Sequence, residues 1–193
     1  MDVRALTGDE IAAYLGDLAR LRIVVFAEYP YLYDGSEDYE AEYIREFAEA
    51  PGAALVAAFD GDRVVGAATA SPMWAQKREF RQPFEERGID TNRLFYFGES
   101  VLLPEYRGRG VGHAFFDHRE AAARAAGANM ACFAAVIREE DHPAKPAGYR
   151  PLDEFWRKRG YGRIDGLITR LSWKEHGDEA ERENSLQYWM REW

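Results

Sequence analysis

Apolar residues recur at helical spacing near the start of the chain. From Ile11 they follow this spacing as far as Phe26, and the pattern ends before Pro30. Thr7 precedes Glu10 by three residues, the spacing of a capping box, in which a hydroxyl and a carboxylate satisfy the first free amides of a helix. The pattern therefore predicts one amphipathic helix that begins near Thr7.

Apolar runs typical of strands follow further along the chain. Residues 53–59 and 64–71 are apolar and partly β-branched, and Asp60-Gly61-Asp62 separates them. An Asp-Gly pair tolerates the positive φ of a tight turn, so the two runs predict a β-hairpin. Residues 72–93, which carry aromatic side chains between polar flanks, predict a helix.

The middle of the chain combines two apolar runs with a helical stripe. Residues 94–103 are almost all apolar or aromatic, which predicts a central strand buried on both faces, and residues 130–137 predict a second buried strand. Between them a helical stripe begins at Val111 and stops at Gly127. The order strand, glycine loop, helix, strand predicts a crossover unit whose loop lies at a strand's carboxyl end, where ligands commonly bind.

The last third of the chain is less regular. Three prolines within residues 138–151 predict an irregular loop, and residues 152–159 predict a short helix that Gly160 ends. Apolar residues are interleaved with polar ones at residues 164–173 and 186–193, on either side of a charged stretch. We favour a long hairpin here, with an amphipathic helix over the tail as the alternative. Both arrangements bury the aromatic residues.

Composition and charge narrow the class of protein. The chain has 193 residues, of which 47% are hydrophobic, enough to bury a real core in about one domain. It carries 25 Lys and Arg against 34 Asp and Glu, a net charge of −9. Because an acidic chain repels a phosphate backbone, we expect no nucleic-acid partner.

Cysteine usage and the start of the chain bear on the compartment. Cys132 is the single cysteine, so no internal disulfide can form. The first residues lack a basic and apolar leader, and no apolar run reaches the length of a membrane span. We therefore expect a cytoplasmic protein with no membrane partner.

Residues 107–112, which read Arg-Gly-Arg-Gly-Val-Gly, carry the clearest chemical signal. A dinucleotide fingerprint that starts at Gly108 would need glycine where His113 stands, and a P-loop would need Gly-Lys-Ser/Thr at its end. Neither motif fits. Glycines let backbone amides converge on an oxyanion at the positive end of a helix, and Arg107 and Arg109 add local positive charge. The loop therefore predicts a pyrophosphate site.

Arg107, Gly110 and Gly112 have the spacing Arg/Gln-x-x-Gly-x-Gly/Ala, after a strand and before a helix. With this motif the chain resembles the GCN5-related N-acetyltransferase (GNAT) superfamily, and residues 102–112 and 21–26 are also typical of it. The resemblance implies an α/β fold of layered helices and strands, with a mixed, mostly antiparallel sheet of six to seven strands. The sheet would be splayed where the cofactor inserts.

The resemblance further implies one N-acetyltransferase domain over residues 1–193, with a cofactor motif at 94–127 and a C-terminal hairpin at 164–193. It implies acetyl-CoA as acyl donor, and a backbone amide near Leu102 as donor to the oxyanion of the attacked thioester. The cofactor-binding residues that it implies are Val101, Leu102, Leu103, Arg107, Gly108, Arg109, Gly110, Val111, Gly112 and His113.

Acetyl transfer to an amine needs a base, because an ammonium group with a pKa near 10.4 is protonated at pH 7. Glu99 is our candidate, since burial in an apolar strand would make its carboxylate a better base; a buried structural glutamate is the alternative. Many relatives have a tyrosine acid four residues before a Gly-aromatic pair, where this chain has Trp156. Tyr149 is the substitute candidate if its loop folds over the sulfur. Arg138 follows the second strand, where relatives often have asparagine.

The acceptor side is marked by aromatic and acidic residues. Tyr29, Tyr31 and Tyr33 lie among carboxylates, either as a solvated loop before a short helix or as an aromatic, anionic wall for a cationic substrate. Cys132 is expected in the core. The four histidines form no metal-binding pair, so we expect no metal.

These observations favour an enzyme, an acetyl-CoA-dependent N-acetyltransferase that acts on a primary amine of a small molecule or peptide by direct attack in a ternary complex. The alternative is a non-catalytic acyl-CoA-binding or regulatory module on the same fold. A third interpretation, an interaction protein, would require the aromatic tail at residues 188–193 to be exposed, whereas we expect it in the core or at an interface. A homodimer is an expectation from the family.

Overall fold

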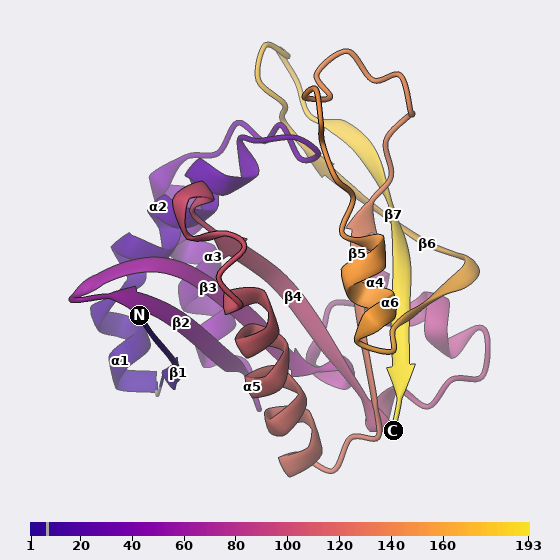
Figure 1. Ribbon diagram of the computed structural model, residues 1–193. Helices are drawn as coiled ribbons and strands as arrows, with labels where there is room; N and C mark the ends of the chain where they lie inside the picture. The colour runs from indigo at the N-terminus through magenta and orange to yellow at the C-terminus, as the bar shows by residue number, and fades with distance from the viewer. Residues whose placement is uncertain (7) are drawn as a thin grey trace.

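The computed structural model describes residues 1–6 and 8–193, so the helix start predicted at Thr7 lies outside the described residues. Its centre is one seven-stranded mixed sheet with the strand order β1-β2-β3-β4-β5-β7-β6 (Figure 1). The strands are β1 (Asp2–Leu6), β2 (Ala54–Asp60), β3 (Arg63–Pro72), β4 (Leu94–Leu102), β5 (Met130–Val136), β6 (Gly162–Trp173) and β7 (Arg182–Glu192).

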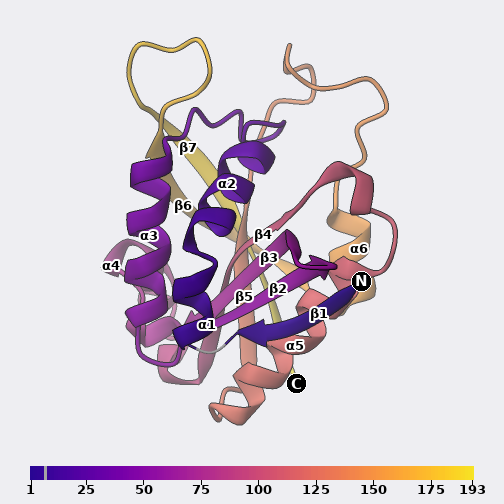
Figure 2. The ribbon, with the colours of Figure 1, turned by 90° about the vertical axis from the view of Figure 1, so that its left-hand side faces the viewer.

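Helices cover both faces of the sheet. Figure 2 shows α2 and α3 on one face and α5 on the other. The helices are α1 (Gly8–Ala13), α2 (Leu15–Phe26), α3 (Glu37–Glu49), α4 (Arg78–Glu85), α5 (Val111–Ala125) and α6 (Asp153–Lys158), with short 3-10 turns η1 (Met73–Ala75), η2 (Thr91–Arg93) and η3 (Pro104–Tyr106). None of the helices in the described part of the chain is long and apolar enough to cross a membrane.

The sheet is split between β4 and β5. The two strands are parallel, but they pair only from Leu94 opposite Met130 to Tyr96 opposite Cys132. Beyond Tyr96 both strands continue without pairing, and Figure 1 shows them close together at one end and apart at the other. One core cluster lies between β1–β3, α2 and α5, and two others join β4 to β5 and β7. The gap therefore opens along an edge of β4 that no strand covers.

A β-bulge lies at the start of the gap. Ala68 of β3 is opposite Ser100 and Ala70 is opposite Phe97, so Thr69 alone faces two residues of β4, Gly98 and Glu99. A bulge of this kind bends its strand and re-aims a side chain. Here it turns the Glu99 side chain toward α2 and α3, where its contacts lie.

The structure confirms the predicted hairpin of β2 and β3, the central strand β4 and the crossover through α5 to the parallel strand β5. The C-terminal hairpin is also confirmed, and the alternative of a helical tail is wrong. Strand β7 lies between β5 and β6 and pairs with both, so its aromatic residues enter the core. Tyr188 is 0% and Trp189 1% exposed, which contradicts the interaction-protein interpretation of an exposed tail.

Three expectations about local structure were wrong. The predicted single N-terminal helix is two, α1 and α2, because the chain turns at Tyr14, whose ring packs against Phe59 with centroids 5.3 Å apart. Strand β1 was missed, since its burial comes from pairing with β2 far along the chain. Within residues 72–93 only α4 is α-helical, because Gly88 has a positive φ of 70° and ends the helical stretch.

Candidate active site

The glycine-rich loop leads directly into α5. Gly108 and Gly110 have φ values of 74° and 85°, a region that side chains with a Cβ disfavour. A Cβ added to either glycine would meet no protein atom within 4 Å, so the space beside both is open. Because the first amides of a helix have no partner within it, the amides after Gly110 present donors at the positive end of α5. The loop can therefore bind an anion through its backbone.

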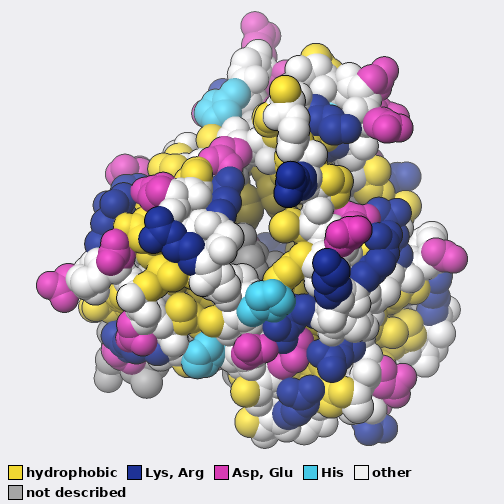
Figure 3. All heavy atoms as spheres, in the orientation of Figure 1, with side chains coloured by type: hydrophobic (Ala, Val, Ile, Leu, Met, Phe, Trp, Pro, Cys, Tyr) yellow, Lys and Arg dark blue, Asp and Glu magenta, His cyan; other side chains and the backbone are white. Residues whose placement is uncertain are grey.

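Figure 3 shows the surface hollowed between the half of the molecule with α2 and the half with β5–β7, with Lys and Arg side chains along the rim. The two arginines of the loop differ in their surroundings. Arg107 donates from Nε to the carbonyl of Leu102 at 3.1 Å, and its Nη2 lies 2.9 Å from the carboxylate of Glu28. Arg109 forms no ion pair within the described residues, and its guanidinium lies over the ring of Tyr106. Within the described residues, no carboxylate therefore compensates the positive charge of Arg109.

The free edge of β4 presents alternate backbone groups to the gap. The Leu103 amide donates to the carbonyl of Val65 in β3, at 3.0 Å. Successive amides of a strand point to opposite edges, so those of Leu102 and Ser100 point away from β3, toward the gap. The Leu102 carbonyl on this edge already accepts from Arg107. Val101 and Leu103, which are also predicted to bind the cofactor, have buried side chains, and the Leu103 amide is bonded to β3.

Two further predicted cofactor residues, Gly112 and His113, lie against α6. A Cβ on Gly112 would be 3.5 Å from the ring of Phe155, and the His113 ring packs edge-on against the same ring, with centroids 4.9 Å apart. Arg159 from the end of α6 lies 2.6 Å from Asp117 of α5. Side chains therefore fix the first turns of α5 to α6.

Glu99 belongs to a buried charge cluster on the face of α2 and α3. Its Oε1 lies 2.7 Å from Nη1 of Arg22, and its Oε2 accepts from the Tyr43 hydroxyl at 3.4 Å. Arg22 also binds Glu40, which is fully buried and accepts from the Tyr33 hydroxyl at 2.7 Å. One guanidinium thus lies between two carboxylates. Glu99 is buried, as predicted, but among charged partners rather than apolar ones.

The charges of this cluster shift the pKa values of the residues in and beside it. The negative charge of Glu99, together with burial, raises the pKa of Tyr43. Burial alone would lower the pKa of Arg22, but Glu99, Tyr43 and Glu40 outweigh it and raise that pKa. Burial and then Glu99 raise the pKa of Tyr31 to about 12. With two carboxylates and one guanidinium, the ionised cluster carries one net negative charge.

The proline-rich loop folds onto the connection between α2 and α3. The rings of Tyr29 and Tyr149 meet edge-on with centroids 4.7 Å apart, and His142 lies 5.7 Å from Tyr29. Burial of the half-buried Tyr149 raises its pKa. Trp156, which stands where relatives have a tyrosine, packs against Phe133 and Trp189. The loop therefore brings Tyr149 into contact with Tyr29.

A bridge after the end of α2 joins the two halves of the split sheet. It consists of residues 30–34, residues 173–176 and the side chain of Arg138. Tyr33 pairs with Glu175 as an isolated β-bridge, and the indole of Trp173 donates to the carbonyl of Tyr31 at 3.0 Å. These contacts connect the segment after α2 to the end of β6 and the segment after it.

Arg138 is the centre of this bridge and was missed as a site residue. It donates to the carbonyls of Pro30 at 2.6 Å and Tyr31 at 3.0 Å, and to Glu175 at 2.7 Å and Asn184 at 3.0 Å. The signal available in the sequence was the arginine in place of asparagine after the second strand. This difference from the relatives did not indicate the partners of Arg138, which are distant along the chain.

The acidic segment after α2 is less negative than its sequence indicates, because the chain's own cations compensate it. Arg107 pairs with Glu28, Lys174 with Asp34, and Arg45 with Glu42. The Tyr31 ring packs on Phe26, with centroids 4.5 Å apart. The aromatic and anionic wall stays a prediction.

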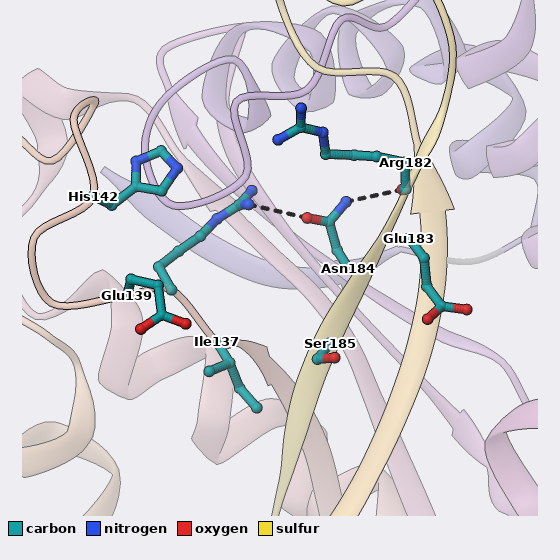
Figure 4. Close-up of a pocket in the computed structure, with 8 residues that line it drawn as sticks. Ile137, Glu139, His142, Arg182, Glu183, Asn184 and Ser185 are labelled. Atoms are coloured by element: carbon teal, nitrogen blue, oxygen red, sulfur yellow. Dashed lines mark hydrogen bonds between the residues drawn. The ribbon is translucent and has the colours of Figure 1, made fainter.

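A polar pocket of about 330 Å³ lies beside the bridge. Figure 4 shows Glu139 and His142 on the proline-rich loop and Arg182, Glu183, Asn184 and Ser185 on β7 around it, with Ile137 at the end of β5. The lining carries charges of both signs.

Cys132 is buried in the core, as predicted, and burial raises the pKa of its thiol. Within residues 1–6 and 8–193, no three His, Cys, Asp or Glu residues are grouped so as to hold a metal.

Comparison with known proteins agrees with this geometry. The family model described as "Acetyltransferase (GNAT) family" matches residues 20–161. An aminoglycoside 6'-N-acetyltransferase complexed with coenzyme A is 16% identical, with a TM-score of 0.63 over 100% of this chain and 97% of that one. A ribosomal-protein-alanine N-acetyltransferase from Brucella melitensis is 15% identical, with a TM-score of 0.61 over 100% of both chains.

A phosphinothricin acetyltransferase from Sinorhizobium meliloti, in complex with AcCoA, is 19% identical, with a TM-score of 0.58 over 99% of this chain and 87% of that one. At these identities the likeness shows a shared fold. No curated protein matches the chain.

Proposed function

Because the chain belongs to the acetyltransferase (GNAT) family and is an acyltransferase, we propose that it transfers the acetyl group of acetyl-CoA to a primary amine. The acceptor is a small molecule or peptide, and the amine attacks the thioester directly in a ternary complex. The observation that carries this proposal is the gap between β4 and β5, with the glycine-capped end of α5 at one side and the Glu99 cluster at the other.

On the donor side, the backbone amides of residues 108–113 bind the pyrophosphate. Both positive-φ glycines leave open space for this approach, and Arg109 adds a positive charge. Arg107 acts differently in this proposal: it holds the Leu102 carbonyl and so orders the edge of β4. The Leu102 amide then donates to the thioester oxygen as negative charge develops on it.

Glu99 is the general base of the proposed reaction. An acceptor arrives as an ammonium and must lose a proton before it can attack. The cluster of Glu99, Glu40 and Arg22 carries one net negative charge, which attracts that cation. Glu99 takes the proton directly or through a water molecule.

Tyr149 is the proposed general acid for the departing thiolate. Support comes from its contact with Tyr29 and from the absence of an acid at Trp156, whose side chain is an indole packed in the core. Tyr29, Tyr31 and Tyr33 line the acceptor side beside the bridge. We place the reaction in the cytoplasm, and we treat residues 1–193 as one N-acetyltransferase domain.

The first test is calorimetric titration with CoA and acetyl-CoA. We expect Gly110→Trp to weaken binding about 100-fold or more, because the indole fills the space beside the amides, and Arg107→Ala to weaken it by about 10-fold. Gly61→Trp is the matched control, since Gly61 also has a positive φ and open space but lies in the turn of β2 and β3. Equal losses in the two Trp variants, or no binding to the wild type, would contradict the proposed donor site.

Thiol release in the presence of a panel of amines then tests catalysis. We expect Glu99→Gln to lower kcat by about 100-fold while CoA affinity stays within about 2-fold of the wild type. Binding of CoA without transfer to any amine would instead favour the alternative, a non-catalytic acyl-CoA-binding module, which the missing tyrosine at Trp156 would explain.

A further inference from the structure

Arg119 is a buried cation that takes no part in the proposed reaction. It lies in α5, on the face of the sheet opposite the Glu99 carboxylate, and is 2% exposed. Its guanidinium lies against the rings of Phe97 and Phe116, 4.6 and 4.7 Å from their centroids. Among the described residues it forms no ion pair. Burying an uncompensated charge is costly, so the contacts that this guanidinium does make call for an explanation.

Two of those contacts are with the backbone of the β-bulge. Nη1 of Arg119 donates to the carbonyls of Thr69 and Glu99, each at 3.4 Å, and Nε donates to the carbonyl of Phe115 at 3.3 Å. Thr69 and Glu99 are the residues at which the pairing of β3 and β4 is interrupted. One guanidinium thus bonds both strands at the point where they lose their regular register.

The opposite side of the bulge is held by a side chain. The Glu99 amide donates to Oγ1 of Thr69 at 3.1 Å instead of to a strand carbonyl. A Cβ on Gly98 would lie 2.5 Å from that oxygen, so only glycine leaves the hydroxyl its place. The bulge is therefore fixed by Thr69 through the Glu99 amide and by Arg119 through the Glu99 carbonyl.

We propose that Arg119 and Thr69 form a clamp that positions Glu99. The clamp fixes the peptide groups on both sides of the Glu99 Cα and so directs the carboxylate to Arg22 and Tyr43 on the other face. Arg119 and Thr69 are positioning residues, because they bond to the backbone of Glu99 and not to the reacting groups. The clamp itself does not depend on the proposed function. Only its consequence, that a displaced Glu99 slows acetyl transfer, rests on that function.

Lysine cannot replace Arg119 in this clamp. A guanidinium presents several donors in one plane, whereas an ammonium is a compact point charge that is strongly hydrated. Thr69→Val keeps the branched shape of the side chain but loses the oxygen that accepts from the Glu99 amide. The two variants therefore test the two sides of the clamp separately.

Amide hydrogen exchange of the full chain tests the clamp without any substrate. In Arg119→Met and in Thr69→Val we expect the Glu99 amide to exchange about 10-fold faster than in the wild type, while that of Ala57 in β2 changes by less than about 2-fold. Arg124→Met, on the exposed side of α5, is the matched control and leaves both amides unchanged. Equal acceleration at Glu99 and Ala57, or none at Glu99, would overturn the clamp. If Arg119→Met does not fold, Thr69→Val decides.

Kinetics of acetyl transfer give the second readout. We expect Arg119→Met to lower kcat about 10-fold with the KM for acetyl-CoA within about 2-fold of the wild type, and Arg119→Lys to restore little. In the Glu99→Gln background the same substitution should cost less than about 2-fold, because it acts through Glu99. Independent losses that multiply would refute positioning through Glu99. If the wild type transfers no acetyl group, the proposed function fails, and hydrogen exchange still decides the clamp.

Discussion

The proposed donor and acceptor sides of the gap are built in different ways. The donor side comes from one continuous segment, from Ser100 to His113, and offers backbone amides held by two positive-φ glycines. The acceptor side combines residues 29–34, residues 138–149 and residues 173–176, which are far apart along the chain. Side chains hold it together, with Arg138 as the centre.

This difference determines what each side tolerates. A backbone site depends on local conformation, so only the glycines and the helix start are strictly required. A side-chain site depends on each partner in a buried network, and removing one leaves another charge or carbonyl unsatisfied. The acceptor side can therefore be damaged without harm to the donor side, and the following variants test that separation.

The largest effect is expected from Arg138→Met. It leaves Glu175 buried without its main partner and the oxygens of Pro30 and Asn184 without the donor that they have in the wild type, so we expect a loss of about 3 kcal/mol in the free energy of unfolding. CoA affinity should stay within about 2-fold, since the donor side is untouched. Urea unfolding and CoA titration measure the two quantities.

Arg170→Met is the control for this variant, because Arg170 is exposed and pairs with the exposed Glu183 at the surface. It should cost less than about 1 kcal/mol. If Arg138→Met weakens CoA binding as strongly as it lowers stability, the two sides are coupled and the comparison above is wrong.

A smaller effect concerns alkaline pH. The pKa of Tyr31 is raised from 10.0 to about 12, so between these values the unfolded chain loses this proton while the folded chain keeps it. The contribution of Tyr31 to stability is therefore complete below pH 10 and is lost as the pH rises toward 12. Relative to Tyr31→Phe, the wild type should lose up to about 1 kcal/mol more between pH 8 and pH 10.5.

Urea unfolding of both proteins at the two pH values measures this difference. Tyr14→Phe is the control because that phenol packs on the other side of the molecule, near Phe59. A pH dependence identical in wild type and Tyr31→Phe would show that the acceptor side does not bury this phenol as the structure places it.

The smallest effect is expected where the two sides touch. Glu28 follows α2 on the acceptor side, and its carboxylate lies 2.9 Å from Arg107. Glu28→Gln removes a negative charge beside the pyrophosphate site, so CoA should bind about 2-fold to 3-fold more tightly at low salt, with the gain reduced at high salt. Titration at two salt concentrations checks this, with Glu42→Gln on the surface of α3 as control. Weaker binding would mean that Glu28 holds Arg107 in place.

The sequence allowed much of the donor side to be predicted, because its determinants are local. The spacing of Arg107, Gly110 and Gly112 indicated the loop, and the apolar run before it indicated β4. The sequence could not show that Arg107 turns back to the Leu102 carbonyl and to Glu28. That orientation depends on where α2 ends in space.

The acceptor side was only partly predictable. The tyrosines and the proline-rich loop were identified, but the partners of Arg138 and the ion pairs that compensate the acidic segment are tertiary contacts. Glu99 was identified from its place in an apolar strand, whereas Arg22 on α2 and the bulge at Thr69 were not. A bulge shifts register by one residue and leaves no clear sequence pattern beyond a glycine such as Gly98.

The position of β7 between β5 and β6 has a consequence for how the protein is made. Among the strands of the described residues, β6 pairs with β7 alone, and β7 comprises residues 182–192. During synthesis β1 to β4, which are neighbours in the sheet in the order of the chain, can assemble as they leave the ribosome. Strand β6 must wait, without a partner, until β7 has been translated. Its apolar residues are therefore open to chaperones for that interval, and a pause in translation before residue 182 would prolong it.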